Sequence, residues 1–189
     1  MKKLFSIVLS VLLILSLAAC AKKDDTGTDN SSMKYDIAAF LSYGKVPETD
    51  FRLKSSIDEI KNKYTESVEG ELSDELYITS DDTRICLAAT DEMSYYYFDA
   101  ANQQAGAQAI FCFDVAYGIQ VGEADENELK LAYSGITFSE REVSQEELYF
   151  SPTEMEGVKS LYYESGEFRA DFYFSEGILF AVGISVIKQ

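Results

Sequence analysis

Residues 125–133, DENELKLAY, align without a gap with residues 56–64, SIDEIKNKY, at a constant offset of 69 residues. Each stretch opens with a residue type that caps helices, Asp125 or Ser56, and carries a glutamate three positions later. In this capping-box pattern the cap side chain and the glutamate each bind the other's backbone amide. The fifth and ninth residues of each stretch are apolar or aromatic and share one helical face. Each stretch is therefore predicted to begin a short amphipathic helix that buries this face against a sheet.

Around the two predicted helices the apolar period falls to about two, which indicates β-strands. A short extended piece is expected before each helix, at residues 51–53 and 119–121. The strands expected after the helices lie at 76–79, 84–89, 93–98 and 107–115 in a first unit and at 147–150, 158–164, 167–174 and 178–187 in a second. Short turns at 165–166 and 175–177 are typical of hairpins. We expect an α+β fold in which two tandem helix-plus-antiparallel-strand units form one sheet with helices on one face.

The pattern resembles the tandem helix-plus-sheet domains of secreted β-lactamase inhibitor proteins and of small outer-membrane assembly lipoproteins. Gly122 and Gly135 match the glycines that flank the helix in those families, whereas the first copy has Leu53 and Glu66 at the corresponding positions. The resemblance implies a concave sheet with helices on the other face, a surface suited to protein or peptide binding. It assigns a role to no individual residue.

The amino terminus has the layout of a secretory signal, with a cationic stretch at residues 1–3 and an apolar run at 4–17. A helix of that length rises about 21 Å, short of the roughly 30 Å hydrocarbon core of a bilayer. The run is followed by Leu17-Ala18-Ala19-Cys20, which resembles the lipobox of bacterial lipoproteins. That resemblance implies cleavage before Cys20 and a covalent lipid anchor on its sulfur. An ordinary signal peptide with a small-residue cleavage site is the alternative.

These features divide the chain into a signal peptide at 1–19, a lipidated cysteine with a flexible tether at 20–34, and a globular domain at 35–189. The tandem units within the domain are expected at about 35–118 and 119–189. The tether is predicted because residues 21–34 are mostly polar, with too few large apolar side chains to form a core.

The charge of the chain is strongly acidic, with 16 Lys and Arg against 33 Asp and Glu, a net charge of −17. Nucleic-acid binding through phosphate neutralisation is therefore disfavoured. The mature chain, without Lys2 and Lys3, would be more acidic still, so an anionic bilayer would repel it and the lipid must supply the anchor. We expect attachment to the cell membrane or the outer membrane, with the domain on the extracytoplasmic side.

Cysteine chemistry is limited to Cys86 and Cys112 once Cys20 is assigned to lipid. If the strands of the first unit form a simple meander, one strand separates the two cysteines by about 9–10 Å, beyond disulfide reach. Two small buried side chains are therefore favoured, with a disulfide in an oxidising compartment as the alternative.

Aromatic side chains provide the candidate binding residues, because the chain has 13 Tyr and 12 Phe. Alternation along 167–174 predicts that the phenylalanines face the core and that Tyr173 faces the other way. Both faces of 95–98 are aromatic, so a tyrosine is expected to point outward there. A recognition surface would then comprise Tyr95, Tyr97, Tyr162 and Tyr173. The alternative is that these rings fill a thick core.

Catalytic and metal sites find little support in the sequence. The chain has no histidine, which excludes Ser-His-Asp and Cys-His catalysis. The acidic stretch at 123–128 lacks the glycine and the final glutamate of a calcium loop, and helix capping explains its acids. We therefore expect no cofactor, no metal site and no catalysis, but a lipid-anchored binding or interaction domain for an extracytoplasmic protein partner. The alternatives are an inhibitor of a secreted enzyme or an envelope-assembly accessory that uses the aromatic sheet face, and a carboxylate-based hydrolase.

Overall fold

The computed structural model describes residues 35–65, 76–89, 93–148, 150 and 155–187. The predicted signal peptide, lipobox and tether, including Cys20, lie outside these residues. Within the described ranges, no helix has the length and apolar character needed to cross a membrane.

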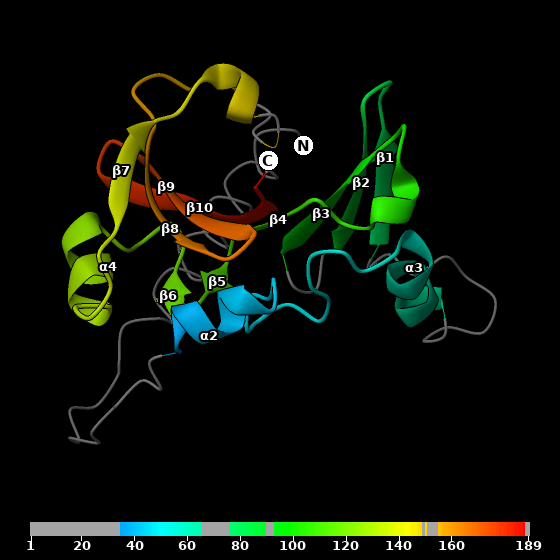
Figure 1. Cartoon of the computed structure of the whole chain (residues 1–189). Helices are drawn as coiled ribbons and strands as arrows, with labels where there is room; N and C mark the ends of the chain where they lie inside the picture. The colour runs from blue at the N-terminus through cyan, green and yellow to red at the C-terminus, as the bar shows by residue number, and fades with distance from the viewer. Residues whose placement is uncertain (1–34, 66–75, 90–92, 149, 151–154, 188–189) are drawn as a thin grey trace, which may run out of the picture. The chain divides into compact units, whose positions relative to one another are not determined.

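The domain is built on one eight-stranded sheet with the order β1-β2-β3-β4-β10-β9-β8-β7, in which every pair of neighbours is antiparallel (Figure 1). Its strands are β1 (Leu76–Ser80), β2 (Arg84–Ala89), β3 (Ser94–Asp99), β4 (Ala109–Cys112), β7 (Ser139–Glu142), β8 (Lys159–Ser165), β9 (Phe168–Ser175) and β10 (Ile178–Val186). A separate two-stranded ribbon joins β5 (Val115–Ala116) to β6 (Ile119–Gln120). The expected α+β class is therefore confirmed in its general form, an antiparallel sheet accompanied by a few helices.

The helices of the described residues are short: α2 (Ile37–Ser42), α3 (Ile57–Thr65) and α4 (Glu126–Ala132), with 3₁₀ turns η2 (Gln103–Ala105) and η3 (Gln145–Leu148). Both predicted capping boxes are confirmed. The Ser56 hydroxyl accepts from the Glu59 amide at 3.1 Å, and the Glu59 carboxylate accepts from the Ser56 amide at 2.9 Å. Asp125 and Glu128 make the same reciprocal pair at the start of α4.

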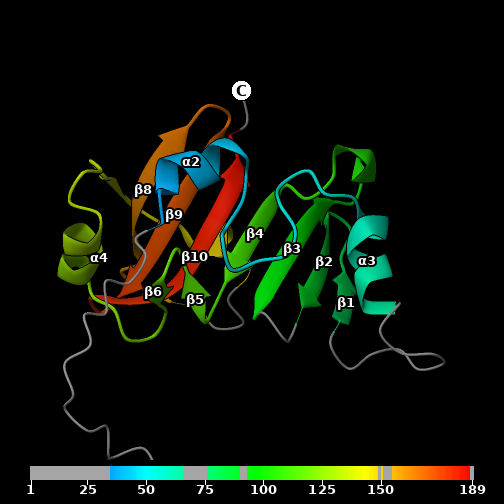
Figure 2. The ribbon, with the colours of Figure 1, turned by 90° about the horizontal axis from the view of Figure 1, so that it is seen from below.

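One side of the sheet, which we call the helix face, carries the main core. Buried residues of α2, α3 and α4 join one apolar cluster with residues of the central strands. Ile60, Tyr64, Leu129 and Tyr133 are all buried in it, as the shared spacing of the two stretches predicts. Helix α2 lies over β8 and β9 on the same side as α3 (Figure 2).

The opposite side, the open face, has a second and smaller apolar cluster. Phe111, Tyr173 and Ala181 of the sheet pack there against Leu148 and Phe150, which follow β7 along the chain. This segment covers one part of the open face. Side chains of the strands themselves form the rest of the open face.

The strand predictions are largely confirmed, with errors in both predicted units. The predicted strand at 147–150 is wrong, because residues 145–148 form the 3₁₀ turn η3, in which Glu147 accepts hydrogen bonds from Ser144 and Arg141. Strand β7 was not predicted, because its sequence SERE shows no apolar alternation. The extended piece expected at 51–53 is a bend and turn, and the long strand expected at 107–115 is divided between β4 and β5.

Cys86 and Cys112 form no disulfide with each other. They lie on β2 and β4 with β3 between them, as the meander argument predicts. Cys86 is level with Tyr97 of β3, and Cys112 is level with Ser94. Because those positions are three apart, the two thiols point to opposite faces of the sheet. Cys112 is buried, as expected, whereas Cys86 is only partly buried.

Candidate functional site: a hollow on the open face

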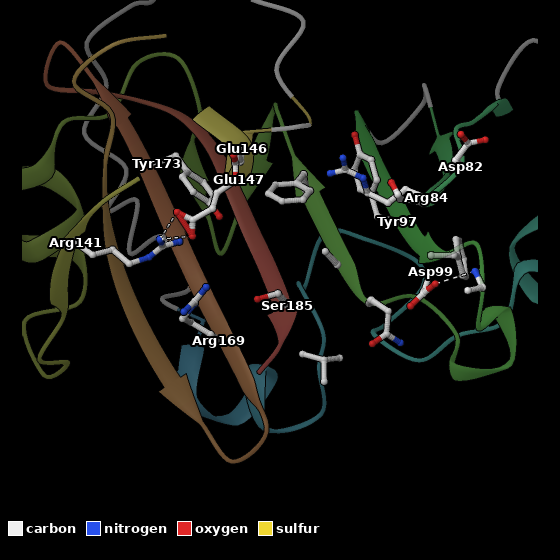
Figure 3. A pocket seen from close by; sticks show the side chains of 17 residues that line it. Asp82, Arg84, Tyr97, Asp99, Arg141, Glu146, Glu147, Arg169, Tyr173 and Ser185 are labelled. Atoms are coloured by element: carbon white, nitrogen blue, oxygen red, sulfur yellow. Dashed lines mark hydrogen bonds and ion pairs between the residues drawn. The ribbon is translucent and has the colours of Figure 1, made fainter. Parts of the chain in front are cut away.

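The open face contains a hollow of about 660 Å³, within the usual range for small-molecule or side-chain pockets. Its lining comes from β2, β3, β4, β9 and β10, from β7 and η3 on one side, and from the turns next to β2 and β3 on the other. Figure 3 shows Arg141, Glu147 and Arg169 on one side, Arg84, Tyr97 and Asp99 on the other, and Ser185 between them.

The depth of the hollow comes from small residues in the middle of the sheet. Strand register places Tyr97 of β3 beside Ala109 of β4, Ala109 beside Ser185 of β10, and Ser185 beside Arg169 of β9. Cross-strand neighbours point to the same face. The short side chains of Ala109 and Ser185 therefore lie between Tyr97 and Arg169. These two short side chains form the floor of the hollow.

An aromatic group closes one end of this floor. The Phe111 ring stacks on Phe150 with centroids 4.0 Å apart and meets Tyr97 edge-on at 5.6 Å. Gly183, its cross-strand neighbour, has no side chain, and a Cβ there would lie 2.6 Å from the Phe111 ring. Gly183 thus lets the Phe111 ring pack flat between β10 and Phe150, where it is only 3% exposed.

A buried carboxylate organises the wall formed by β7, β8 and β9. Asp171 is only 2% exposed, and its Oδ2 accepts from Nε of Arg169 at 2.7 Å. Its Oδ1 accepts from the Ser160 hydroxyl at 2.7 Å and from Nε of Arg141 at 3.1 Å. This buried charge is therefore paired with two arginines and a hydroxyl, as a carboxylate away from water requires.

Arg141 also bonds to Glu147 of η3, with its Nη1 at 2.7 and 2.9 Å from the two carboxylate oxygens. Burial alone would lower the pKa of Arg141, but Asp171 and Glu147 outweigh burial and raise it. Burial likewise tends to raise the pKa of Glu147, but hydrogen bonds from Ser144 and Arg141 lower it overall. Both shifts favour the charged forms.

The wall formed by β2 and β3 carries Arg84, whose cross-strand neighbour is Asp99. Nε of Arg84 lies 4.0 Å from Asp81. The Asp81 carboxylate accepts from the Thr83 hydroxyl and from the Thr83 and Arg84 amides, each at 2.7 Å. The Thr83 hydroxyl bond, followed by the amide bonds, lowers the pKa of Asp81. Asp99 accepts from the Ala101 amide at 2.8 Å.

Three of the four arginines of this acidic chain line the hollow, namely Arg84, Arg141 and Arg169. The carboxylates in its lining are Asp82, Asp99, Glu146 and Glu147. Among the residues that the structure describes, Asp82 and Glu146 make no hydrogen bond or ion pair, whereas Arg141 and Arg169 are both bonded to Asp171.

The predicted tyrosines all belong to the open face, because Tyr162 is level with Asp171 and Tyr95 with Phe111. Tyr97 and Tyr173 line the hollow, and Tyr95 and Tyr162 do not belong to its lining. The expected exposure of Tyr173 is wrong: it is only 5% exposed because Phe150 and Phe180 pack against it. Tyr162 lies under the Arg169 guanidinium, 5.8 Å from the ring centroid.

The arginines and their carboxylate partners were missed by sequence reasoning. Alternation along 167–174 does place Arg169, Asp171 and Tyr173 on one face, which is the available signal. The contributions of Arg84 and Arg141 depend on strand pairing over long sequence distances. The acidic stretch at 123–128 caps α4, as expected, and the described part of the chain holds no cluster of potential metal ligands.

Comparison with known proteins assigns no family. No protein-family model matches the chain, and no curated protein matches it. A crystal structure of a DUF4309 family protein (YjgB) from Bacillus subtilis is similar, with 14% sequence identity and a TM-score of 0.45 over 79% of this chain and 95% of that chain. A similarity of this size assigns no function.

Proposed function

We propose that this chain is a lipid-anchored extracytoplasmic binding domain that holds a partner in the hollow of its open face and catalyses no reaction. The observation that carries the proposal is the hollow itself, with a floor of small residues between the Tyr97 ring and charged walls. Aromatic rings with adjacent charged groups are typical of recognition surfaces.

The bonding of Glu147 and Asp171 opposes a role for these two groups as a hydrolytic pair. A carboxylate pair that hydrolyses a substrate needs one member that keeps a proton near neutral pH. Here Glu147 and Asp171 both bind Arg141, and the pKa of Glu147 is lowered. Arg141 thus holds these two carboxylates in a structural network rather than in an acid–base pair.

We extend the proposal to the architecture: the domain consists of two tandem units. Helix α3 precedes β1 to β4, and α4 precedes β7 to β10. The sheet order places the last strands, β4 and β10, side by side at its centre and the first strands, β1 and β7, at its edges. Two copies of one unit joined through their last strands would give this order. The matched capping boxes of α3 and α4 support the same interpretation.

Under this proposal an enzyme inhibitor and an envelope-assembly accessory are two forms of the same binding role. Both would present the open face to a protein partner while the lipid on Cys20 holds the domain at the membrane. Capture of the partner at the hollow distinguishes the two forms.

Site-specific photo-crosslinking in the intact cell envelope tests the proposed role. A photoreactive amino acid at Ala101, an exposed position of the hollow, should crosslink a partner, and Tyr97→Ala in the same chain should reduce the yield. The matched control is the same photoreactive amino acid at Leu131, which is 75% exposed on α4. Equal crosslinking from Leu131, or a yield that Tyr97→Ala leaves unchanged in a folded protein, would contradict the proposal.

A further inference from the structure

The arginines of the hollow at first suggest an anionic ligand, but their bonding opposes it. Arg141 is shared between Asp171 and Glu147, and Arg169 binds Asp171 through its Nε. Arg84 lies within ion-pair distance of Asp81. Each of the three positive charges is thus already matched by a neighbouring carboxylate.

The carboxylates, by contrast, outnumber the arginines. Four line the hollow, and Asp171 and Asp81 contact its arginines, which gives six carboxylates against three guanidinium groups. Two of the six, Asp82 and Glu146, make no bond to the described residues and lie on opposite walls. The unmatched charge of the hollow is therefore negative.

The floor suits a positively charged group as well. Tyr97 is a partly exposed aromatic ring of the lining, and the face of such a ring attracts cations. The chain as a whole carries a net charge of −17, which steers cations toward the protein over distances comparable to the Debye length.

We infer that the hollow binds a cationic segment of a protein partner, with lysine or arginine side chains near Asp82 and Glu146 and apolar side chains against the Tyr97 ring. This inference rests on the proposed binding function and adds the chemical class of the partner. The arginines, bonded to these carboxylates, fix the wall of the hollow.

The test measures binding of three fluorescent nine-residue peptides to the full chain in a neutral detergent. The peptides share alternating phenylalanines and differ only at three positions, which are all lysine, all glutamate or all serine. The lysine peptide should bind about tenfold more tightly than the serine peptide at low ionic strength, and this advantage should fall as salt is added.

Two double variants with the same net charge test whether the preference for the lysine peptide arises from the carboxylates of the hollow. Asp82→Asn with Glu146→Gln should weaken binding of the lysine peptide about fivefold and leave the serine peptide unchanged. Glu123→Gln with Glu142→Gln, two exposed acids outside the lining, should change lysine-peptide binding less than twofold. Thermal unfolding of each variant checks that the fold is retained.

Three results would overturn the inference: tighter binding of the glutamate peptide, failure of the lysine peptide to bind, or equal losses in the two double variants. The first would assign the arginines to an anionic ligand, and the last would assign the effect to net charge alone. In each case, a Tyr97-dependent crosslink from Ala101 would still support the binding function. Loss of that crosslink would contradict the proposed binding function as well.

Discussion

Asp171 is the residue on which the wall of the hollow depends, because its buried charge is held by Arg141, Arg169 and Ser160. Arg141→Ala removes one cation from a carboxylate that water cannot reach and also releases Glu147. We expect a loss of about 3 kcal/mol in the free energy of unfolding, measured by denaturant titration. Lys130→Ala, which removes an exposed ion pair with Glu126, should cost less than about 1 kcal/mol. Similar losses for the two variants would contradict this account of Asp171.

Gly183 is required by a close approach rather than by a turn. Gly183→Ala would place a methyl group against the Phe111 ring, which is packed against Phe150 and cannot withdraw easily. We expect a loss of about 1–3 kcal/mol in unfolding free energy from this overpacking. Gly135→Ala is the matched control, because a Cβ there meets no atom within 4 Å. A Gly183→Ala protein as stable as the wild type would show that the Phe111 ring is loosely packed.

The two capping boxes give a prediction for the elements α3 and α4. Ser56→Ala and Asp125→Ala each remove the side-chain acceptor for a first-turn amide, so each should cost about 1 kcal/mol of unfolding free energy. Asn127→Ala, in the same turn of α4 but with an exposed side chain, should change stability by less than about 0.5 kcal/mol. Denaturant titration of all three variants measures these differences, and a negligible cost at either cap would remove support for equivalent units.

The end of α4 is tied to the β5–β6 ribbon, where the Tyr133 hydroxyl donates to the Tyr117 carbonyl oxygen. Glu48 accepts from the backbone amides of Tyr117 and Gly118 in the same turn. Burial, followed by the charge of Glu48, raises the pKa of Tyr133 to about 12, and burial also raises that of Tyr117. This contact joins the second helix to the helix-face core.

The raised phenol pKa values predict alkaline sensitivity. Between about pH 10 and pH 12 the unfolded chain loses a Tyr133 proton that the folded chain retains, so stability falls as pH rises through this window. Tyr133→Phe should flatten that decline and cost about 1 kcal/mol at neutral pH through the lost hydrogen bond. Denaturant titrations at several pH values measure both effects. Tyr43→Phe, an exposed control, should leave neutral stability unchanged, and an unaltered alkaline decline in Tyr133→Phe would refute the assignment.

At the scale of the whole molecule, the proposed role requires an anchor on Cys20 that is separate from the folding of residues 35–189. Cys20→Ser should shift the protein out of the membrane fraction, because an anionic bilayer repels a chain with this excess of acidic residues. Cell fractionation with mass determination of the amino terminus checks this. The melting temperature of the domain should not change. A variant that stays in the membrane with an uncleaved amino terminus would instead identify residues 4–17 as the anchor.

The sequence by itself determined the local elements. Capping boxes and apolar spacing placed α3 and α4, and alternation placed β2, β3, β8, β9 and β10, because these signals depend on neighbours a few residues apart. The expected meander also correctly predicted that one strand separates Cys86 from Cys112. The same local signals failed at β7, whose polar residues pair only because β8 offers an open edge.

Only the tertiary structure decided the hollow. The floor needs Ala109 beside Ser185, and the wall needs Arg141 beside Asp171, pairs that lie 76 and 30 residues apart in the sequence. Pairing at such distances depends on sheet register, and a shift of one residue would turn every side chain to the other face. The hollow also depends on Phe150, which covers Tyr173. Tyr173 was expected on the surface but is buried in a core for this reason. Local periodicity fixes which side chains share a face, but packing between distant strands decides which of them stay open to a partner.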